Sequence, residues 1–317
     1  MSILRCLVVN DLLRDRLAVD FAGLKLGNPT MLASGILGYS TETFESMSEG
    51  GAGAIVTKSI GLEPRNGYVN PTVVQMSFGL VNAMGLPNPG MDEFVHEIRR
   101  AKTVLKVPLI VSVYGYSEDE YALLAKKGVE AGADAVELNV SCPHVKCTGS
   151  EIGQSPKLLA ATVKKAKAAI DKPVIVKLSP NVTSIAALAD VAARAGADAL
   201  TAINTVKAMA INVEAGMPIL SNGVGGLSGP AIKPIALRCV YDIFGQVEIP
   251  IIGCGGITNW RDAAEFLLAG ASAVQIGTAV ALKGPRVFST ITRGLSAYLR
   301  MKGYQSVSEI VGLSHRR

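Results

Sequence analysis

The stretch Gly132-Ala-Asp-Ala-Val-Glu-Leu-Asn139 opens with a Gly-Ala-x-Ala phrase, continues as a short apolar run and ends on a polar residue. Three other stretches repeat the pattern, at 51–58, 196–204 and 270–278. The glycine suits the left-handed position just past a helix, and the apolar run is typical of a buried parallel strand. Each copy therefore predicts a helix end, a strand and a polar tip, which is the repeating unit of a β/α array.

Three prolines open further apolar runs: Pro108 in PLIVSV, Pro173 in PVIVKL and Pro250 in PIIGCG. Proline is tolerated at the first position of a strand, where its missing N–H is not yet needed in the ladder. Amphipathic segments separate the runs, among them Asn259 to Ala269, with an asparagine cap, and Pro285 to Met301, with a proline in the first turn.

Together with a run around 30–33, the two repeats predict eight strands. We expect them near 30–33, 54–58, 108–113, 134–139, 173–178, 198–203, 250–253 and 273–277. Eight strand–helix alternations indicate an α/β protein with a (β/α)8 TIM-barrel fold. A chain of 317 residues that is 49% hydrophobic suits one such domain, which we expect at 16–317 after an N-terminal extension at 1–15.

The segments that follow the second, fourth and sixth predicted strands are long, at 59–90, 140–154 and 205–229. Loops after barrel strands lie at the C-terminal face, where ligands bind. We therefore expect long βα loops to cover one pocket at that face.

The charge pattern argues against polymer and membrane partners. The net charge is +5, and the lysines and arginines are scattered without a long basic block, which is typical of solvated helix faces and predicts no nucleic-acid partner. Arg5, Asp11 and Arg14 interrupt the apolar pieces at the N-terminus, so neither a signal peptide nor a spanning helix is expected. We expect a cytoplasmic protein.

The five cysteines are Cys6, Cys142, Cys147, Cys239 and Cys254. An odd number in such a chain favours free thiols over a disulfide framework, and the C-x4-C spacing of Cys142 and Cys147 does not complete an iron–sulfur motif. The three histidines form no ligand-spaced cluster, so neither a metal site nor a Ser-His-Asp triad is expected. Cys142 remains as a candidate base or nucleophile.

Glycine-rich stretches occur at Gly223 to Gly229 and Gly253 to Gly256, followed by Gly277-Thr278. Bare backbone amides after strands seven and eight of a barrel form a phosphate site, because glycine permits close approach of an anion. Tight turns alone would be the other explanation. The positions at strand ends favour a phosphorylated cofactor or substrate.

Lys58 and Lys177 lie at the ends of the second and fifth predicted strands. A lysine inside a barrel mouth is costly to desolvate without an anionic partner, which favours a ligand role over a side chain that reaches the rim. Asn139 and Asn204 offer donor and acceptor groups to a heterocycle, although loop capping would account for them equally well.

Several motifs occur together in order: Thr57-Lys58-Ser59, Asn82-Ala-Met-Gly-Leu-Pro-Asn88, Asn139-Val-Ser-Cys-Pro-His144, Val176-Lys177-Leu-Ser-Pro-Asn181, Ile203-Asn204-Thr205, Gly225-Gly-Leu-Ser-Gly-Pro230 and Gly253 to Gly256. In this set the chain resembles the class-1 dihydroorotate dehydrogenases from about Asp15 to Gly303. The resemblance implies an FMN barrel that oxidises (S)-dihydroorotate to orotate in pyrimidine biosynthesis. It also implies that Cys142 is the general base for the C5 proton while the C6 hydrogen leaves as hydride to the flavin.

The same resemblance implies two further sets of residues. Substrate binding would fall to Lys58, Asn82, Met84, Gly85, Leu86, Asn139, His144, Asn204 and Thr205. FMN binding would fall to Ala33, Ser34, Gly35, Lys58, Ser59, Ser112, Asn139, Lys177, Ile203, Ser228, Gly229, Gly255, Gly256, Gly277 and Thr278. Lys177 would lie near flavin N1, and the last six residues would hold the FMN phosphate.

His144 departs from the family pattern, since many class-1 enzymes have asparagine there. The Cys-Pro-His version is similar to dihydropyrimidine dehydrogenases, so a flavoenzyme acting on uracil or thymine is the alternative. The Asn82 to Asn88 loop is of the orotate type and favours dihydroorotate. A tRNA-dihydrouridine synthase would need a basic appendage, a non-redox barrel would carry no flavin, and a scaffold would leave the strand-end lysines and asparagines unexplained.

The electron acceptor stays open between fumarate and NAD reached through a separate FAD and iron–sulfur subunit. The stretches from Asn82 to Gly90 and from Gly225 to Pro234 favour the B type of the class-1 family, which implies a homodimeric core with that electron-transfer subunit. Cys147 is interpreted as a non-catalytic loop thiol.

Overall fold

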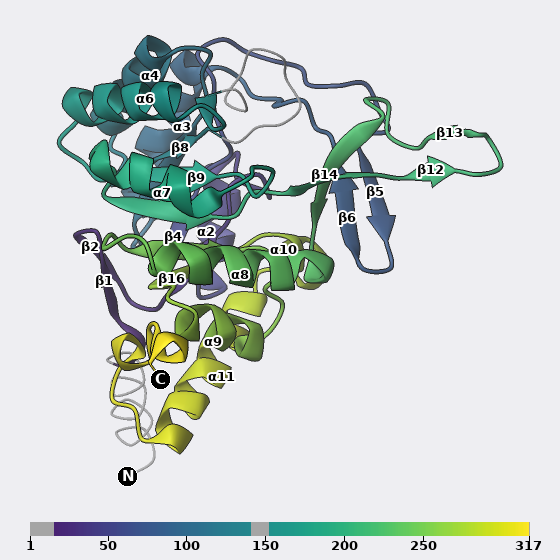
Figure 1. Ribbon diagram of the computed structural model, residues 1–317. Coiled ribbons are helices and arrows are strands. Elements are labelled where there is room, and N and C mark those ends of the chain that lie inside the picture. Colours follow the sequence, from purple (N-terminus) through teal and green to yellow (C-terminus); the bar gives the residue numbers. More distant parts are fainter. Residues whose placement is uncertain (1–15, 141–151, 317) are drawn as a thin grey trace.

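The computed structural model describes residues 16–140 and 152–316, and its centre is a closed barrel of eight parallel strands (Figure 1). Each strand pairs with the next in sequence around the barrel, and the last pairs with the first. The eight predicted strands are confirmed, as is the TIM-barrel fold. They are β3 (Thr30–Leu32), β4 (Ala54–Val56), β7 (Leu109–Val113), β8 (Ala135–Asn139), β9 (Val174–Leu178), β10 (Ala199–Ala202), β15 (Ile251–Cys254) and β16 (Ala273–Ile276).

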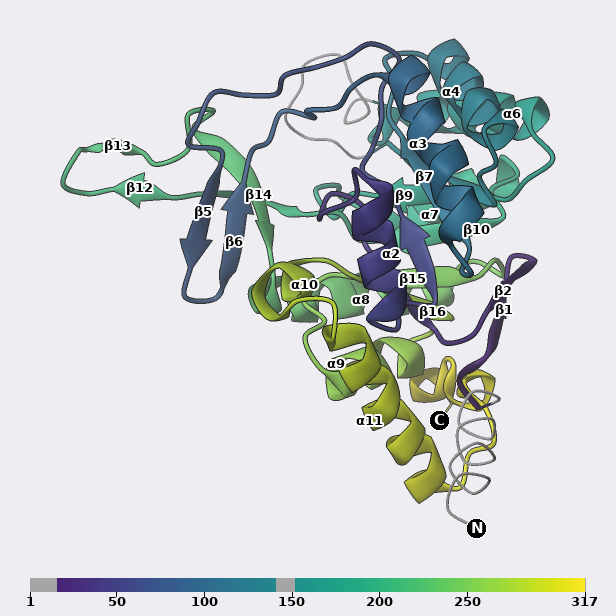
Figure 2. The same cartoon turned by 180° about the vertical axis from the view of Figure 1, so that it is seen from behind.

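Helices surround the barrel on its outside (Figure 2). They are α2 (Thr41–Glu49), α3 (Met91–Val104), α4 (Glu118–Glu130), α6 (Pro156–Ala169), α7 (Ile185–Arg194), α8 (Lys233–Phe244), α9 (Trp260–Leu268), α10 (Thr278–Lys283) and α11 (Val287–Lys302), with short 3-10 turns η1 (Pro230–Ile232), η2 (Val307–Ile310) and η3 (Leu313–His315). The predicted cap at Asn259 is confirmed, because its side chain accepts hydrogen bonds from the backbone N–H groups of Arg261 and Asp262. The predicted start of the last helix at Pro285 was wrong: Arg286 is the N-cap, and Pro285 belongs to a turn after Gly284, whose φ is 72°.

The four repeated glycines end four helices in the same way. Gly51, Gly132, Gly196 and Gly270 each follow the C-cap residue and have φ between 101° and 117°. In each copy the glycine N–H bonds to the carbonyl three residues back, and the next alanine N–H bonds to the carbonyl five residues back. This is the Schellman motif, in which glycine carries no Cβ penalty. The repeat therefore sets where each helix ends and its strand begins.

The barrel interior has two layers. Side chains alternate along a strand, so residues two apart share a face. The lower layer is apolar and contains Ile110, Ala135, Ile175, Ala199, Ile252 and Ala273. Phe21, Leu24 and Leu26, from the hairpin of β1 (Val19–Phe21) and β2 (Leu24–Leu26), belong to the same cluster and close the N-terminal end of the barrel.

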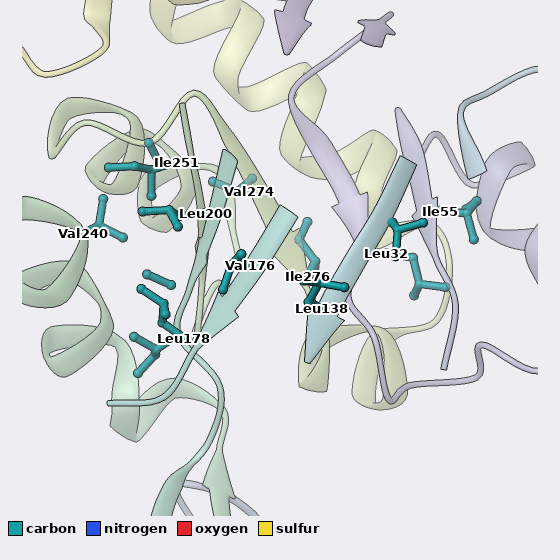
Figure 3. Packing of buried hydrophobic residues seen from close by; sticks show 14 of the residues in the cluster. Leu32, Ile55, Leu138, Val176, Leu178, Leu200, Val240, Ile251, Val274 and Ile276 are labelled. Atoms are coloured by element: carbon teal, nitrogen blue, oxygen red, sulfur yellow. The ribbon is translucent and has the colours of Figure 1, made fainter. Parts of the chain in front are cut away.

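The outer faces of the strands pack against the helices in a second and larger apolar cluster (Figure 3). Val176 on β9, Leu200 on β10 and Val274 on β16 are fully buried members of it. Burying each such side chain stabilises the fold by roughly 1.5 to 3 kcal/mol relative to exposure. The strands are thus apolar on both faces in their lower half, which is why they read as continuous hydrophobic runs.

Two of the long segments pair with each other in a way that the sequence pattern did not predict. They form a four-stranded antiparallel sheet in the order β11 (Val206–Met209), β14 (Val224–Ser228), β6 (Gly79–Asn82) and β5 (Val73–Met76). A further hairpin, β12 (Ile211–Asn212) and β13 (Met217–Pro218), projects away from it (Figure 1). The sheet lies on the opposite side of the barrel from the β1–β2 hairpin in both views.

The helix-ending glycines differ in the space around them, which allows a graded test. A Cβ at Gly196 would meet a lysine side-chain atom at 3.6 Å, whereas a Cβ at Gly270 would lie 2.2 Å from the Phe244 ring. We expect Gly196→Ala to cost about 1 to 2 kcal/mol from backbone conformation, and Gly270→Ala to cost roughly 2 to 5 kcal/mol because overpacking is added. Gly245→Ala is the control, since Gly245 has helical φ and open space. Denaturant unfolding should give this order, and equal losses at 196 and 270 would contradict it.

Candidate active site

A cavity of about 600 Å³ opens at the carboxyl ends of the barrel strands, beside the four-stranded sheet of β11, β14, β6 and β5, which we call the inserted sheet. Its lining includes most of the described residues that the sequence predicted for the site. These are Ala33, Ser34, Gly35, Lys58, Ser59, Asn82, Met84, Gly85, Leu86, Asn139, Lys177, Ile203, Asn204, Thr205, Ser228, Gly229, Gly255, Gly256, Gly277 and Thr278. Cys142, His144 and Cys147 lie outside the described residues. Segments from both halves of the chain thus meet in one pocket.

Ser112 is the exception among the described site residues, because it does not line the cavity. It is fully buried behind Ser59, whose hydroxyl oxygen lies 3.0 Å from its own. Ser112 also donates to Glu137 Oε1 at 3.4 Å. Its position supports the cavity wall through Ser59.

A polar layer lies directly above the apolar layer of the barrel interior. It is formed by the residue two positions further along each of six strands: Ser112, Glu137, Lys177, Thr201, Cys254 and Gln275. Glu137 is at its centre, accepting hydrogen bonds from Thr201 Oγ1 at 3.0 Å and Gln275 Nε2 at 2.6 Å. Lys177, Cys254 and Gln275 of this layer line the cavity and form its floor.

Lys177 has an anionic partner within this layer. Its Nζ lies 3.7 Å from Glu137 Oε1 and donates to Gln275 Oε1 at 2.9 Å. Both side chains are almost completely buried and form a pair, so a protein carboxylate already offsets part of the desolvation cost of this lysine. Lys177 still lines the cavity, so a ligand above it would meet a cation whose charge is shared with Glu137.

The sequence reasoning missed Glu137, Thr201 and Gln275. A signal was present, because each is a polar residue inside an otherwise apolar predicted strand. Tyr39 was missed as well; it lines the cavity, and its ring lies 5.8 Å from Lys58 Nζ.

The asparagines form a connected group on one wall of the cavity. Asn139 Nδ2 donates to Ser59 Oγ at 2.9 Å, and Asn204 Nδ2 lies 3.2 Å from Asn139 Oδ1. Asn204 Oδ1 in turn accepts from the backbone N–H of Thr205 at 2.8 Å. These bonds orient the two amides toward the same space, which suits the donor and acceptor pattern of a planar heterocycle.

The glycine-rich stretches lie together at another end of the cavity. Gly229, Gly255 and Gly256 have φ of 97°, 128° and 79°, and a Cβ on any of them would come within 3.0 Å of a neighbouring atom. Thr278 Oγ1 donates to Ser228 Oγ at 2.8 Å, which brings two hydroxyls beside the glycines. Exposed backbone and hydroxyl groups of this kind fit a phosphate group.

Neither free cysteine of the described region has an activated thiol. Burial raises the pKa of Cys254, and the nearby Lys177 opposes that change only in part. Burial likewise raises the pKa of Cys239. Although Cys254 lines the cavity, its neutral thiol would be a weak base at neutral pH.

An ion pair braces the loop after β15. Asp262 accepts from the Thr258 backbone N–H and hydroxyl, both at 2.8 Å, and from Lys233 Nζ at 2.8 Å. Burial alone would raise the pKa of Asp262, but the hydrogen bonds from Lys233 and Thr258 and the lysine charge hold it below its usual range. Hydrogen bonds to Asp262 and Glu265 raise the pKa of Lys233 in turn. Thr258 lines the cavity, so this pair fixes one of its walls.

Comparison with known proteins decides the family. A model described as dihydroorotate dehydrogenase matches residues 16–299 of the chain. The chain belongs to the dihydroorotate dehydrogenase family. It is 55% identical over 298 residues to the dihydroorotate dehydrogenase B (NAD(+)) catalytic subunit of Pyrococcus abyssi, covering 94% of this chain and 99% of that protein.

Other family members show the same relationship at greater distance. The chain is 49% identical over 301 residues to the protein of the same name from Methanothermobacter thermautotrophicus, covering 94% of this chain and 98% of the relative. The crystal structure of the dihydroorotate dehydrogenase of Eimeria tenella in complex with ferulenol shares its fold with a TM-score of 0.83 at 24% identity, covering 96% of this chain and 90% of the other. Within residues 16–140 and 152–316, no helix is long and apolar enough to cross a membrane.

The buried pair under the cavity gives a stability prediction. Glu137→Gln keeps the side-chain volume but leaves Lys177 without its anion, so the free energy of unfolding should fall by roughly 3 to 5 kcal/mol. Adding Lys177→Met should recover much of that loss, because no buried charge then remains. Asp190→Asn, which breaks an exposed pair with Arg194, is the control and should change stability little. A single variant as stable as the wild type would contradict the importance of the pair.

The lowered pKa of Asp262 gives a pH prediction. Because the folded-state pKa lies below the unfolded value of about 3.9, the carboxylate stabilises the fold above that pH, and this contribution is lost as pH falls through the folded-state pKa. Asp262→Asn should therefore lower the free energy of unfolding by a constant amount between about pH 5 and 8, and the gap should narrow below about pH 4. Unfolding measured across this range tests it, and a gap unchanged by acid would contradict the role of the ionised carboxylate.

Proposed function

We propose that the chain oxidises (S)-dihydroorotate to orotate with FMN as its resident cofactor. The observation that carries the proposal is the convergence of three elements in one cavity: the asparagine group, the buried lysine of the floor, and the glycine-rich cradle. Family membership supports the same reaction, because the related proteins are named dihydroorotate dehydrogenases. Their names also do not favour the alternative of a dihydropyrimidine dehydrogenase-type flavoenzyme acting on uracil or thymine.

The described residues fit FMN. The glycines and the two hydroxyls would hold its phosphate, and Ala33, Ser34, Gly35 and Ser59 line the space toward Lys177. Bound FMN would supply a two-electron acceptor for the hydride from C6 of the substrate. Lys177 would place a fixed positive charge beside the flavin, which favours its anionic reduced form.

The remaining residues would bind substrate and move a proton. Asn82, Asn139, Asn204 and Thr205 would hold the pyrimidine edge, while Lys58 and the 84–86 backbone would receive the carboxylate, with His144 a further substrate contact. Cys142 follows Asn139 by three residues in the sequence and would take the C5 proton. A free thiol has a pKa of about 8.5, so its surroundings must stabilise the thiolate or exclude water.

The proposal extends to partners and organisation. The relatives are named NAD(+)-linked catalytic subunits, which supports a separate partner subunit. The proposal is that this subunit carries FAD and an iron–sulfur cluster for electron transfer, and that the present chain forms a homodimeric core. We assign residues 1–15 to an extension and 16–317 to the barrel domain. A cytoplasmic location agrees with the free thiols of Cys239 and Cys254.

Anaerobic mixing of the purified FMN-loaded protein with dihydroorotate tests the proposal. Oxidised-flavin absorbance should bleach rapidly with dihydroorotate and not with dihydrouracil. Bleaching by dihydrouracil alone would overturn the substrate assignment.

Cys142→Ser tests the base. The variant should keep its FMN and reduce it about 10² to 10⁴-fold more slowly near neutral pH, because serine is a far weaker base. Cys147→Ser, a change of the same kind five residues along the chain, is the matched control and should reduce at the wild-type rate. An unchanged rate in Cys142→Ser would remove Cys142 from the mechanism.

A further inference from the structure

The cavity-lining segment Met84–Pro87 has an unusual backbone arrangement, in which all four carbonyl oxygens accept hydrogen bonds from groups of neighbouring segments. Three of the donors are side chains and one is a backbone N–H. The pairs are Tyr68 N to Met84 O at 3.0 Å, Arg65 Nε to Gly85 O at 2.6 Å, Asn88 Nδ2 to Leu86 O at 2.9 Å and Tyr39 OH to Pro87 O at 2.9 Å. The carbonyls are thereby held by the surrounding protein.

The backbone amides of the same segment are left available. Met84, Gly85 and Leu86 line the cavity, and within the described part of the chain none of their N–H groups donates a hydrogen bond. Gly85 and Leu86 have φ of 73° and 58°, so two successive residues are left-handed. Turns of this kind gather successive N–H groups into a concavity that binds anions. The segment is therefore built to receive a negatively charged group.

Leu86 has a backbone conformation that is energetically unfavourable for its residue type. A residue with a Cβ disfavours the left-handed region, and it stays there only where its surroundings determine the conformation. The side chain of Asn88, two residues further along the chain, holds this conformation by donating a hydrogen bond to the Leu86 carbonyl. Leu86 itself is 7% exposed and packs with Tyr114.

Asn88 is in turn held rigidly. Its side chain is buried, its Oδ1 accepts from Gly61 N at 3.2 Å and Gly90 N at 2.9 Å, and its Nδ2 also donates to Tyr114 OH at 2.9 Å. Both donors and both acceptor sites of the amide are thus used. Its backbone N–H and carbonyl pair with Arg65 at 2.9 and 2.8 Å. Six hydrogen bonds fix one residue outside the cavity, which is more than a loop cap requires.

We propose that Asn88 is a positioning residue for the substrate carboxylate: it holds Leu86 left-handed and so aims the amides of Met84, Gly85 and Leu86 into the cavity. This inference rests on the proposed function, which places the carboxylate at these amides. Aspartate could not replace Asn88, because its carboxylate would accept from Gly61 and Gly90 but would repel the Leu86 carbonyl. Asn88 thereby selects for an anionic substituent on the pyrimidine without touching it.

The test uses the FMN-loaded protein, with orotate titrated against the flavin absorbance and dihydroorotate used for flavin reduction. In Asn88→Ala the Kd for orotate should rise about 10- to 100-fold, equivalent to about 1.4 to 2.8 kcal/mol. The KM for dihydroorotate should rise similarly, while the reduction rate at saturation should change less than about threefold, because the amides bind ground state and transition state alike. Asn212→Ala is the matched control, since its side chain caps an exposed hairpin turn through Glu214 N and Ala215 N.

A second pair of variants separates positioning from general stability. Asn88→Asp preserves shape and should still weaken orotate binding at least about tenfold, through loss of the Leu86 contact. Adding Leu86→Gly to Asn88→Ala should restore part of the affinity, because glycine accepts a positive φ without the support of Asn88. A merely structural role would lower the FMN content and would show no such rescue.

The outcomes are distinct. A wild-type holoprotein that does not bind orotate overturns the proposed function and this inference together. A wild-type protein that binds orotate, with both Asn88 variants within about threefold of its Kd, overturns the inference alone. Weakened binding in the Asn88 variants without any rescue by Leu86→Gly overturns the assignment to the conformation of Leu86.

Discussion

Closure of eight parallel strands into one barrel is the constraint on which the rest of the structure depends. Parallel strands bring all their carboxyl ends to the same rim, so residues spread over most of the chain become neighbours there. Asn139, Lys177 and Asn204 lie on three successive βα units and meet only because β8, β9 and β10 are adjacent in the closed sheet. The glycine-rich stretches after β14, β15 and β16 complete the rim from the other side.

The change from an apolar to a polar layer inside the barrel is the second organising feature. One step of two residues along each strand takes the interior from Ile175 and Ala135 to Lys177 and Glu137. A buried charge pair is expensive to desolvate. It is sustained here by hydrogen bonds that Glu137 accepts from Thr201 and Gln275 and by one that Lys177 donates to Gln275. The lower layer supplies stability, and the upper layer supplies a charged and rigid floor for the cavity.

The inserted sheet connects the glycine-rich cradle to the Met84–Pro87 segment, which would bind the substrate. β6 runs directly into the Met84–Pro87 turn, and its partner β14 runs directly into Gly229. The turn and the glycine cradle are therefore connected through one antiparallel pair, the turn following the end of β6 and Gly229 lying beside Gly79 at its start. The frame around the turn, with Asn88 at its centre, shows how residues outside the cavity set the direction of groups inside it.

The sequence by itself determined the eight strands, the glycine ends of four helices and the family, because these depend on local properties: hydrophobic runs, the conformational freedom of glycine and short motifs. Tertiary structure alone decided which buried polar groups form hydrogen bonds with one another. Glu137 contacts Gln275 from 138 positions away, and Asn82 Nδ2 reaches the Gly226 carbonyl across 144 positions. The start of the last helix also depended on its turn, since Gly284 and Pro285 fold back before Val287. A pattern along the chain reports how each residue suits a strand or helix, but which buried polar groups satisfy one another depends on distances that only closure of the barrel sets.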